Sequence, residues 1–554
     1  MNEISECVKD IITSVFSIST DVKVTPSPEL NSSFRADYST NVAMQLAGLL
    51  HQNPQEIAKT LTAEFLKAAP QKLPELTGTR TEIAGPGFIN FMLPDAYFAA
   101  ELARLDANFD ENISCDEYAG KVIITEFSDP NPFKVLHIGH LYTSICGESI
   151  SRLIEFAGGT VHRVNFGGDV GLHVAKTLYA LEQKGLTDFT IDDIASCYVE
   201  GTRAYEESED AKAKITELNK EIYHISTENR HDSPLAETYW RGRELSYAYF
   251  DNFYARLGVK FEKYYPESTV ANKGLETVKN HPEVYTESDG ALVFKGEPYG
   301  LHTRVFVNRA GLPTYEAKDV GLLFTKAEDY SFDESIIITG NDVIDYMKVV
   351  LKSIEQYAPD LVAKTLHITH GNVRLPGNQK MASRKGNFIK AIDVLNEVEQ
   401  KASSKTIADA AIKYSLLKYK IGSNIEFDID ESISLTGNSG PYLQYSAVRA
   451  NKILKEISNS KPSFGNYNFN EKEITLIKTF FNYKAVLRDA VHEKAPHLIC
   501  SYLFDLAQTF SRFYETCRVK GDEHEAERAT LVKIFANIMS HGLGLLGINI
   551  PEEM

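Results

Sequence analysis

This sequence has no excess of basic residues. It holds 58 Lys and Arg against 76 Asp and Glu, so the net charge is -18 and the pI is near 5.4. A protein with a uniformly basic coat for nucleic acid is therefore not favoured. A local basic site is still compatible with this total, and charge has to be followed segment by segment.

Paired cysteines are missing as well. The chain has six cysteines, and no two of them are spaced as a Cys-x-x-Cys pair. This spacing predicts neither a disulfide framework nor a zinc site, and it favours a reducing compartment. We expect no dedicated metal site.

Long apolar runs are also absent, and no stretch is long enough to cross a bilayer. The stretch MNEISECVKDIITSVFSIST carries acids where a signal peptide needs basic residues. We expect a soluble, cytoplasmic protein that acts away from membranes.

The material for several hydrophobic cores is present. The chain has 554 residues, of which 43% are hydrophobic and 24% charged, as in ordinary globular proteins. One core rarely grows beyond about 250–300 residues, so about three domains are expected. Residues up to about 118 have helical and then strand-like patterns, residues 184–240 are acidic and helical, and the chain is helical from 407 almost to its end.

Two histidines open a predicted helix directly after a predicted strand. The buried-type strand KVIITEF leads through the turn SDPNP to His137, Ile138, Gly139 and His140, and after the helix comes a second strand, TVHRVNF. This is the βαβ unit of a doubly wound sheet. Imidazole N–H groups and a helix N-terminus both suit phosphate oxygens, and glycine lets a ligand approach the backbone. A satisfied buried histidine is the alternative, but this context favours a nucleotide triphosphate site.

One segment departs from the acidic trend. Residues 361–390 contain no Asp or Glu, and their basic residues are Lys364, Arg374, Lys380, Arg384, Lys385 and Lys390. By composition alone, a polyanion contact and a solvated loop are equally compatible. The stretch NQKMASRKGNF inside it favours a flexible basic loop that neutralises charge on a leaving pyrophosphate.

These motifs together resemble the arginyl-tRNA synthetases, a family of class I aminoacyl-tRNA synthetases, along nearly the full chain. EFSDPNPFKVLHIGH is similar to the family's extended HIGH motif, and NQKMASRKGNF is similar to its variant of the KMSKS loop. The other similar stretches are DYSTNVAMQLAGLL, EIAGPGFINFML, YEAKDVG, NSGPYLQYSAVRA and LGINIPEEM.

The resemblance implies an α/β fold with three domains. Residues 1–118 are expected to form an N-terminal α+β domain, an additional tRNA-binding domain. Residues 119–405 are expected to form a doubly wound Rossmann-type catalytic domain with a helical insertion at about 180–290. Residues 406–554 are expected to form an all-helical anticodon-binding domain.

The resemblance also assigns the ATP site. It implies ATP contacts by His137, Gly139, His140, Met381 and Ser383. It implies catalytic roles for His137, His140, Lys134, Lys380, Arg384 and Lys385. Either Arg384 or Lys385 takes the place of the second KMSKS lysine. Ala382 stands where serine is usual, and Tyr142 stands where many relatives have arginine.

Arginine needs a recess of carboxylates, because its guanidinium donates in a fork that pairs with two carboxylate oxygens. The residues implied by resemblance are Asn131, Asp169, Glu267, Tyr315 and Asp319. Tyr315 shares a helix face with Asp319 if this stretch is helical. Asn341 or Asp342 is a looser match, and Val170 stands where the family has an aromatic residue. Without the resemblance, the two acids Glu267 and Asp319 would be interpreted as solvated surface residues, and Asn131 as a turn residue.

For tRNA, the resemblance points to Tyr442, Gln444 and Arg449. Exposed aromatic rings stack on unpaired bases, although Tyr442 and Tyr445 are equally compatible with a core position. The expected reaction joins arginine to the terminal ribose of tRNA(Arg) through an adenylate, with ATP accompanied by Mg²⁺, in a monomer. The alternatives are another class I synthetase such as that for cysteine, a nucleotidyltransferase, and a non-catalytic RNA-binding relative.

Overall fold

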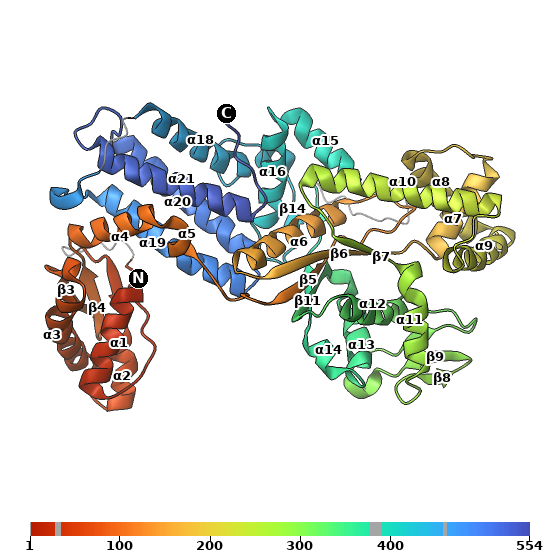
Figure 1. Cartoon of the computed structure of the whole chain (residues 1–554), viewed down its shortest axis with the longest axis horizontal. Coiled ribbons are helices and arrows are strands. Elements are labelled where there is room, and N and C mark those ends of the chain that lie inside the picture. Colours follow the sequence, from red (N-terminus) through yellow and green to blue (C-terminus); the bar gives the residue numbers. More distant parts are fainter. Residues whose placement is uncertain (1, 28–34, 377–388, 458–461) are drawn as a thin grey trace.

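The computed structural model describes residues 2–27, 35–376, 389–457 and 462–554. Three regions are visible in Figure 1: a small sheet with helices at the lower left, a central parallel sheet with helices around it, and a bundle of long helices at the upper left. No helix in the described ranges has both the length and the apolar character that a bilayer span needs. The six cysteines are free thiols.

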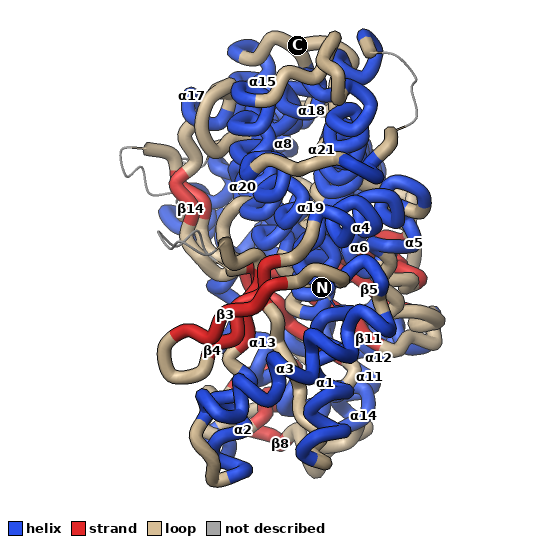
Figure 2. The backbone as a smooth tube through the Cα atoms, turned by 90° about the vertical axis from the view of Figure 1, so that its left-hand side faces the viewer, coloured by secondary structure: helices blue, strands red, loops and turns tan. Residues whose placement is uncertain are grey.

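The N-terminal region is a four-stranded antiparallel sheet, in the order β1-β2-β4-β3, packed against helices. Figure 2 shows the hairpin β3–β4 beside α1, α2 and α3. The helical stretch is divided at Asn53, whose side chain accepts the Gln55 N–H at 2.8 Å and caps α3. The elements are α1 (Asn2–Phe16), β1 (Thr25–Pro26), β2 (Tyr38–Thr40), α2 (Val42–Leu50), α3 (Pro54–Lys72), η1 (Pro74–Leu76), β3 (Arg80–Ala84), β4 (Phe88–Met92), α4 (Asp95–Ala107) and α5 (Phe109–Ile113).

The central sheet has five parallel strands in the order β12-β11-β5-β6-β7. They are β5 (Val122–Glu126), β6 (Thr160–Gly167), β7 (Lys263–Pro266), β11 (Glu334–Gly340) and β12 (Thr365–His370). Four of them coincide with apolar runs in the sequence, whereas the four-residue strand β7 has too short a pattern to stand out. This is a doubly wound order, confirming the expected fold class. It reverses between β5 and β11, and ligands bind at the carboxyl ends of strands at such a switch point.

Helices cover both faces of this sheet, and most of the acidic segment is helical. The apolar stretches GALVFK and TRVFVNR form strands of a separate antiparallel sheet, β10-β9-β8. The helices and short elements are α6 (Ile138–Phe156), α7 (Leu172–Gln183), α8 (Ile191–Glu207), α9 (Glu209–Thr227), α10 (Pro234–Leu257), α11 (Glu267–Lys279), β8 (Thr286–Ser288), β9 (Ala291–Phe294), η2 (Glu297–Tyr299), β10 (Arg304–Val307), α12 (Tyr315–Asp329), η3 (Asn341–Val343), α13 (Ile344–Glu355), α14 (Pro359–Ala363), β13 (Val373–Arg374) and α15 (Ala391–Lys401).

Two glycines allow α11 and α12 to touch. A Cβ on Gly274 would lie 1.8 Å from the Ala317 carbonyl oxygen, and one on Gly321 would lie 2.2 Å from the Val270 carbonyl oxygen. Any side chain at either position would push the two helices apart. Because Glu267 begins α11 and Tyr315 begins α12, this close packing brings the predicted pocket residues of the two helices together.

The C-terminal region is helical, as the sequence predicts. It packs against the N-terminal region through Phe98 of α4, whose ring stacks on Phe481 of α19 with centroids 6.4 Å apart. The elements are α16 (Lys405–Leu417), β14 (Ile425–Glu426), α17 (Ile429–Ser432), α18 (Gly440–Glu456), η5 (Phe464–Asn466), α19 (Glu471–His492), α20 (Pro496–Thr516) and α21 (Glu525–Leu545).

Candidate active site

The turn between β5 and α6 has a strained backbone, and hydrogen bonds to other elements hold it in place. Ser128, Asp129 and Phe133 have positive φ angles of 74°, 50° and 64°, which side chains other than glycine rarely adopt. Each is tied to another element: the Ser128 hydroxyl lies 2.8 Å from the Tyr254 hydroxyl, Asp129 accepts the Phe166 N–H at 2.9 Å, and the Phe133 N–H donates to Ser246 at 3.0 Å. Strain of this kind persists where the surroundings over-determine it, as at ligand sites.

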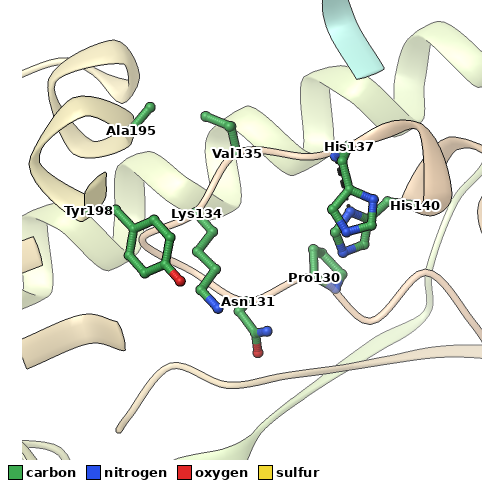
Figure 3. Close-up of a pocket in the computed structure, with 8 residues that line it drawn as sticks. All are labelled: Pro130, Asn131, Lys134, Val135, His137, His140, Ala195 and Tyr198. Carbon is green, nitrogen blue, oxygen red and sulfur yellow. Dashed lines mark hydrogen bonds between the residues drawn. The ribbon is translucent and has the colours of Figure 1, made fainter. Parts of the chain in front are cut away.

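The two histidines of the HIGH motif cap α6. The Gly139 N–H donates to His137 Nδ1 at 3.1 Å, and the His137 N–H donates to His140 Nδ1 at 3.1 Å. The two rings lie 3.8 Å apart between centroids, as Figure 3 shows. A Cβ on Gly139 would lie 2.8 Å from the His137 ring, so glycine is required there. The motif therefore supplies its own helix cap in place of Ser/Thr and Glu.

The same bonds set the proton on each ring. Because each Nδ1 accepts a backbone N–H, each neutral ring carries its proton on Nε2 and can donate it to a ligand. Burial, reinforced by Lys134, lowers the pKa of His137 to about 4. Burial and the neighbouring His137 hold the pKa of His140 well below its usual range. Both rings are neutral donors throughout the physiological range.

The pocket beside these histidines contains further predicted residues. It is lined by Pro130, Asn131, Lys134, Val135, His137, His140, Ala195 and Tyr198. Figure 3 shows Lys134 between Tyr198 and the histidines, and its Nζ lies 5.0 Å from the Tyr198 ring centroid. Asn131 accepts the Gly168 N–H at 2.9 Å, which joins the β5–α6 turn to the end of β6.

The flanks of the basic segment lie against the HIGH motif. On the C-terminal side, the Ile138 N–H donates to Ile389 O at 3.2 Å, and the Ala391 N–H donates to Leu136 O at 2.9 Å. On the N-terminal side, His370 ends β12 beside α6. The predicted loop residues Lys380, Met381, Ser383, Arg384 and Lys385, together with Ala382, lie outside the described residues.

Two of the predicted arginine-binding acids already have cationic partners within the protein. Buried Asp169 accepts bonds from Arg243 Nε at 2.9 Å and from the Ser268 N–H and hydroxyl at 2.9 and 2.7 Å. Buried Glu267 accepts a bond from Lys318 Nζ at 2.6 Å. Lys318, absent from the sequence predictions, lies between Tyr315 and Asp319. These pairs leave little negative charge from either acid for a cationic ligand.

Among the residues that the structure describes, no cation pairs with Asp319. The Tyr346 hydroxyl donates to it, and burial, together with the acids Glu126, Glu267 and Glu316, raises the pKa of Asp319 to about 8. Asp319 and Glu126 line the same small cavity beneath the sheet's switch point. Glu126, the last residue of β5, was not singled out from the sequence, because an acid at a strand end carries no motif of its own. Tyr315 is 55% exposed at the start of α12, available to a ligand.

Glu126 is held by a fully buried lysine. Lys326 of α12 donates from Nζ to Glu126 and, at 3.1 Å, to the Ser335 hydroxyl of β11. Lys326→Met is expected to destabilise the protein by about 3–5 kcal/mol, because it leaves Glu126 buried without its counter-ion. Thermal unfolding should show a fall in melting temperature of roughly 5–15 °C.

The matched control for Lys326→Met is Lys263→Met, which breaks a partly exposed pair with Asp329 and should shift the melting temperature by only about 1–3 °C. The double variant Glu126→Gln/Lys326→Met removes both charges and should recover most of the loss. Equal melting temperatures for the two single variants would show that losing the lysine of the buried pair destabilises the protein no more than losing that of the partly exposed pair.

The predicted tRNA residues occupy different environments on α18. Gln444 is fully buried and donates from Nε2 to Thr406 O at 3.1 Å and to Asn549 O at 2.6 Å, so it joins α16 to the segment that follows α21. Tyr442 is partly buried against Phe504. The Arg449 guanidinium lies 3.9 Å from the Tyr514 ring centroid, and Tyr445 is 41% exposed.

Comparison with known proteins gives matches along the whole chain. Residues 109–416 match the family described as tRNA synthetases class I (R), catalytic domain. Residues 2–93 match the arginyl tRNA synthetase N terminal domain, and residues 443–554 match the DALR anticodon binding domain.

Individual relatives agree with these matches. The arginine–tRNA ligase of Clostridium perfringens is 28% identical over 565 residues, covering 96% of each chain. That of Clostridium botulinum is 27% identical over 586 residues, covering 100% of this chain and 99% of the relative. The Thermus thermophilus arginyl-tRNA synthetase structure has the same fold, with a TM-score of 0.77 at 23% identity over 100% of both chains.

The doubly wound sheet, with a histidine-capped helix at its switch point, is the catalytic architecture of a class I aminoacyl-tRNA synthetase. Within that class, the chain belongs to the arginyl-tRNA synthetase family, whose catalytic-domain match alone covers more than half of its length. The sequence-based prediction of the family is confirmed.

Proposed function

We propose that this chain joins arginine to tRNA(Arg) in two steps at the pocket beside His137 and His140. A carboxylate oxygen of arginine attacks the α-phosphorus of ATP, the bond to the β-phosphate oxygen breaks, and pyrophosphate leaves. A hydroxyl of the terminal ribose of the tRNA then attacks the arginyl carbonyl carbon, and AMP leaves. The observation that carries this proposal is the pair of neutral Nε2–H donors at the N-terminus of α6.

The two histidines act on the phosphates without changing charge. Their Nε2–H groups suit phosphate oxygens, and the N-terminal end of α6 adds partial positive charge. Donors fixed by backbone bonds need no reorganisation as charge develops in the transition state. Lys134 adds a full positive charge at the same wall, and the loop residues Lys380, Arg384 and Lys385 are proposed to neutralise the leaving pyrophosphate.

The guanidinium group of arginine is proposed to bind at Asp319, whose carboxylate suits the forked donors of a guanidinium. Glu126, which lines the same cavity, stays paired with Lys326. Tyr315 covers the entrance, and Asn131 orients the amino-acid end. Asp169 and Glu267 support the pocket through their pairs with Arg243 and Lys318 rather than by binding the ligand.

ATP and tRNA complete the substrates. In the described part of the chain, no cluster of three His, Cys, Asp or Glu side chains has metal-binding geometry, so Mg²⁺ is proposed to arrive with the phosphates of ATP. On α18, Tyr442, Tyr445 and Arg449 are proposed for RNA contact. Gln444 is left out because of its burial. We propose that the enzyme acts as a monomer.

ATP–pyrophosphate exchange with each amino acid in turn, with and without total tRNA, tests this function. Exchange that requires arginine and is enhanced by tRNA is the expected result. Exchange with another amino acid would retain the class and refute the arginine pocket. Tight tRNA binding without any exchange would support a non-catalytic RNA-binding protein instead.

A further inference from the structure

His370, the last residue of β12, lies against the HIGH helix, and neither the sequence motifs nor the mechanism above gives it a role. Its side chain is buried, with only 4% of the residue exposed. Its Nε2 lies 2.6 Å from the Thr143 hydroxyl oxygen, and its Nδ1 lies 2.9 Å from the Gly371 carbonyl oxygen. The ring of Tyr142 packs on it, with centroids 4.5 Å apart. This contact explains why an aromatic residue follows the HIGH motif here.

Three hydrogen bonds meet at this point and require three protons. The Thr143 hydroxyl also donates to the Gly139 carbonyl oxygen at 2.8 Å. Both carbonyl oxygens can only accept, whereas a neutral histidine has one N–H and threonine has one O–H. With neutral His370 the set is therefore one donor short. With a doubly protonated ring, Nδ1–H donates to Gly371, Nε2–H donates to Thr143, and Thr143 donates to Gly139.

The surroundings explain why the charged ring is not favoured in the ligand-free protein. Burial lowers the pKa of His370, and Asp342, which follows β11, opposes this effect. His137 and His140 at the start of α6 also lie near His370, and neither supplies negative charge. A bound triphosphate would supply several negative charges beside α6, and nearby negative charge favours an imidazolium.

We propose that His370 is a positioning residue of the ATP site, which takes up a second proton when the triphosphate binds and in that form ties the end of β12 to Gly139 through Thr143. This inference deepens the proposed function and rests on it, because it places ATP at His137 and His140. This series of hydrogen bonds then links the start of the basic segment to the HIGH motif most firmly when ATP is bound.

The test compares the ATP KM of wild type, His370→Gln and His370→Phe in ATP–pyrophosphate exchange between pH 6 and 8.5, with arginine and tRNA saturating. Glutamine can still donate to Thr143 but cannot gain a proton. The ratio of its KM to the wild-type KM should be about 10 at pH 6 and should fall towards 1 at pH 8.5, since a linked proton changes affinity by up to tenfold per pH unit. Taking a ratio cancels the titration of ATP itself.

The matched control is His367→Gln, on the same strand. His367 bonds to the Thr339 hydroxyl at 2.8 Å. It lies three positions before His370 on the strand, so the two rings lie on opposite faces of the sheet. Its KM ratio should be independent of pH. His370→Phe, which removes the bond to Thr143, should raise the ATP KM at every pH with kcat less affected.

A ratio for His370→Gln that stays constant with pH would overturn the proton uptake, and a wild-type KM for His370→Phe would overturn the positioning role. Calorimetry of ATP binding in two buffers of different ionisation enthalpy provides a second measurement, in which wild type should take up more protons than His370→Gln. Failure of the wild-type protein to catalyse exchange with arginine would instead refute the proposed function.

Discussion

His140→Ala is expected to slow arginine activation by about 10²–10³-fold, because it removes one fixed donor to the phosphate that carries the developing charge. The loss should appear in kcat for ATP–pyrophosphate exchange, and the arginine KM should change little. The physical reason lies in the Nε2–H of a ring that stays neutral because burial holds the pKa of His140 well below its usual range.

Two further substitutions at this position separate catalysis from helix capping. His140→Asn retains an acceptor for the His137 N–H but has no donor in place of Nε2, so it should be as slow as alanine and nearly as stable as wild type. His140→Gln offers a donor near the Nε2 position and should recover part of the rate. Near-normal turnover by the asparagine variant would show that the histidine serves only as a cap.

Asp319→Ala should raise the arginine KM by at least about 30-fold and the ATP KM by less than about threefold, since losing one partner of a buried charge pair costs about 2–5 kcal/mol. Steady-state kinetics with each substrate varied in turn gives both values. Glu316→Gln, on the preceding turn of α12, is the matched control, because Glu316 binds Arg304 rather than Tyr346. Equal increases in the two KM values would contradict a guanidinium partner.

The protonation of Asp319 predicts that the arginine KM depends on pH. Its pKa is about 8 without ligand, and a guanidinium selects the ionised form, so the arginine affinity should rise by up to tenfold per pH unit between about pH 6 and pH 8 and then level off. The free energy of unfolding of the ligand-free protein changes with pH in the opposite direction. An acid whose pKa is raised on folding lowers this free energy as pH rises from about 4 towards 8. The arginine affinity of Asp319→Asn should therefore not depend on pH, and this variant should melt at a higher temperature than wild type at pH 8.

Local patterns account for much of this architecture. The apolar strand, the proline turn and the helix around HIGH could all be predicted, because strand and helix periods and turn residues act within a few positions along the chain. The family's motifs likewise pointed to His137, His140, Asn131 and Asp319, all of which lie at or near the switch point. The strand β7 could not be predicted, because four residues do not establish a period.

What the tertiary structure alone decided is which charges remain available to a ligand. The partners of Glu267, Asp169 and Glu126 lie 51, 74 and 200 residues away in sequence, so no spacing rule relates them. The burial of Gln444 depends in the same way on the carbonyl group of Asn549, 105 residues further on. Residue types and short-range periodicity therefore determined the fold class and the motifs. Long-range packing decided that Asp319, unlike those three acids, is left for arginine to pair with, because buried charges pair with whichever counter-ion the folded chain places beside them.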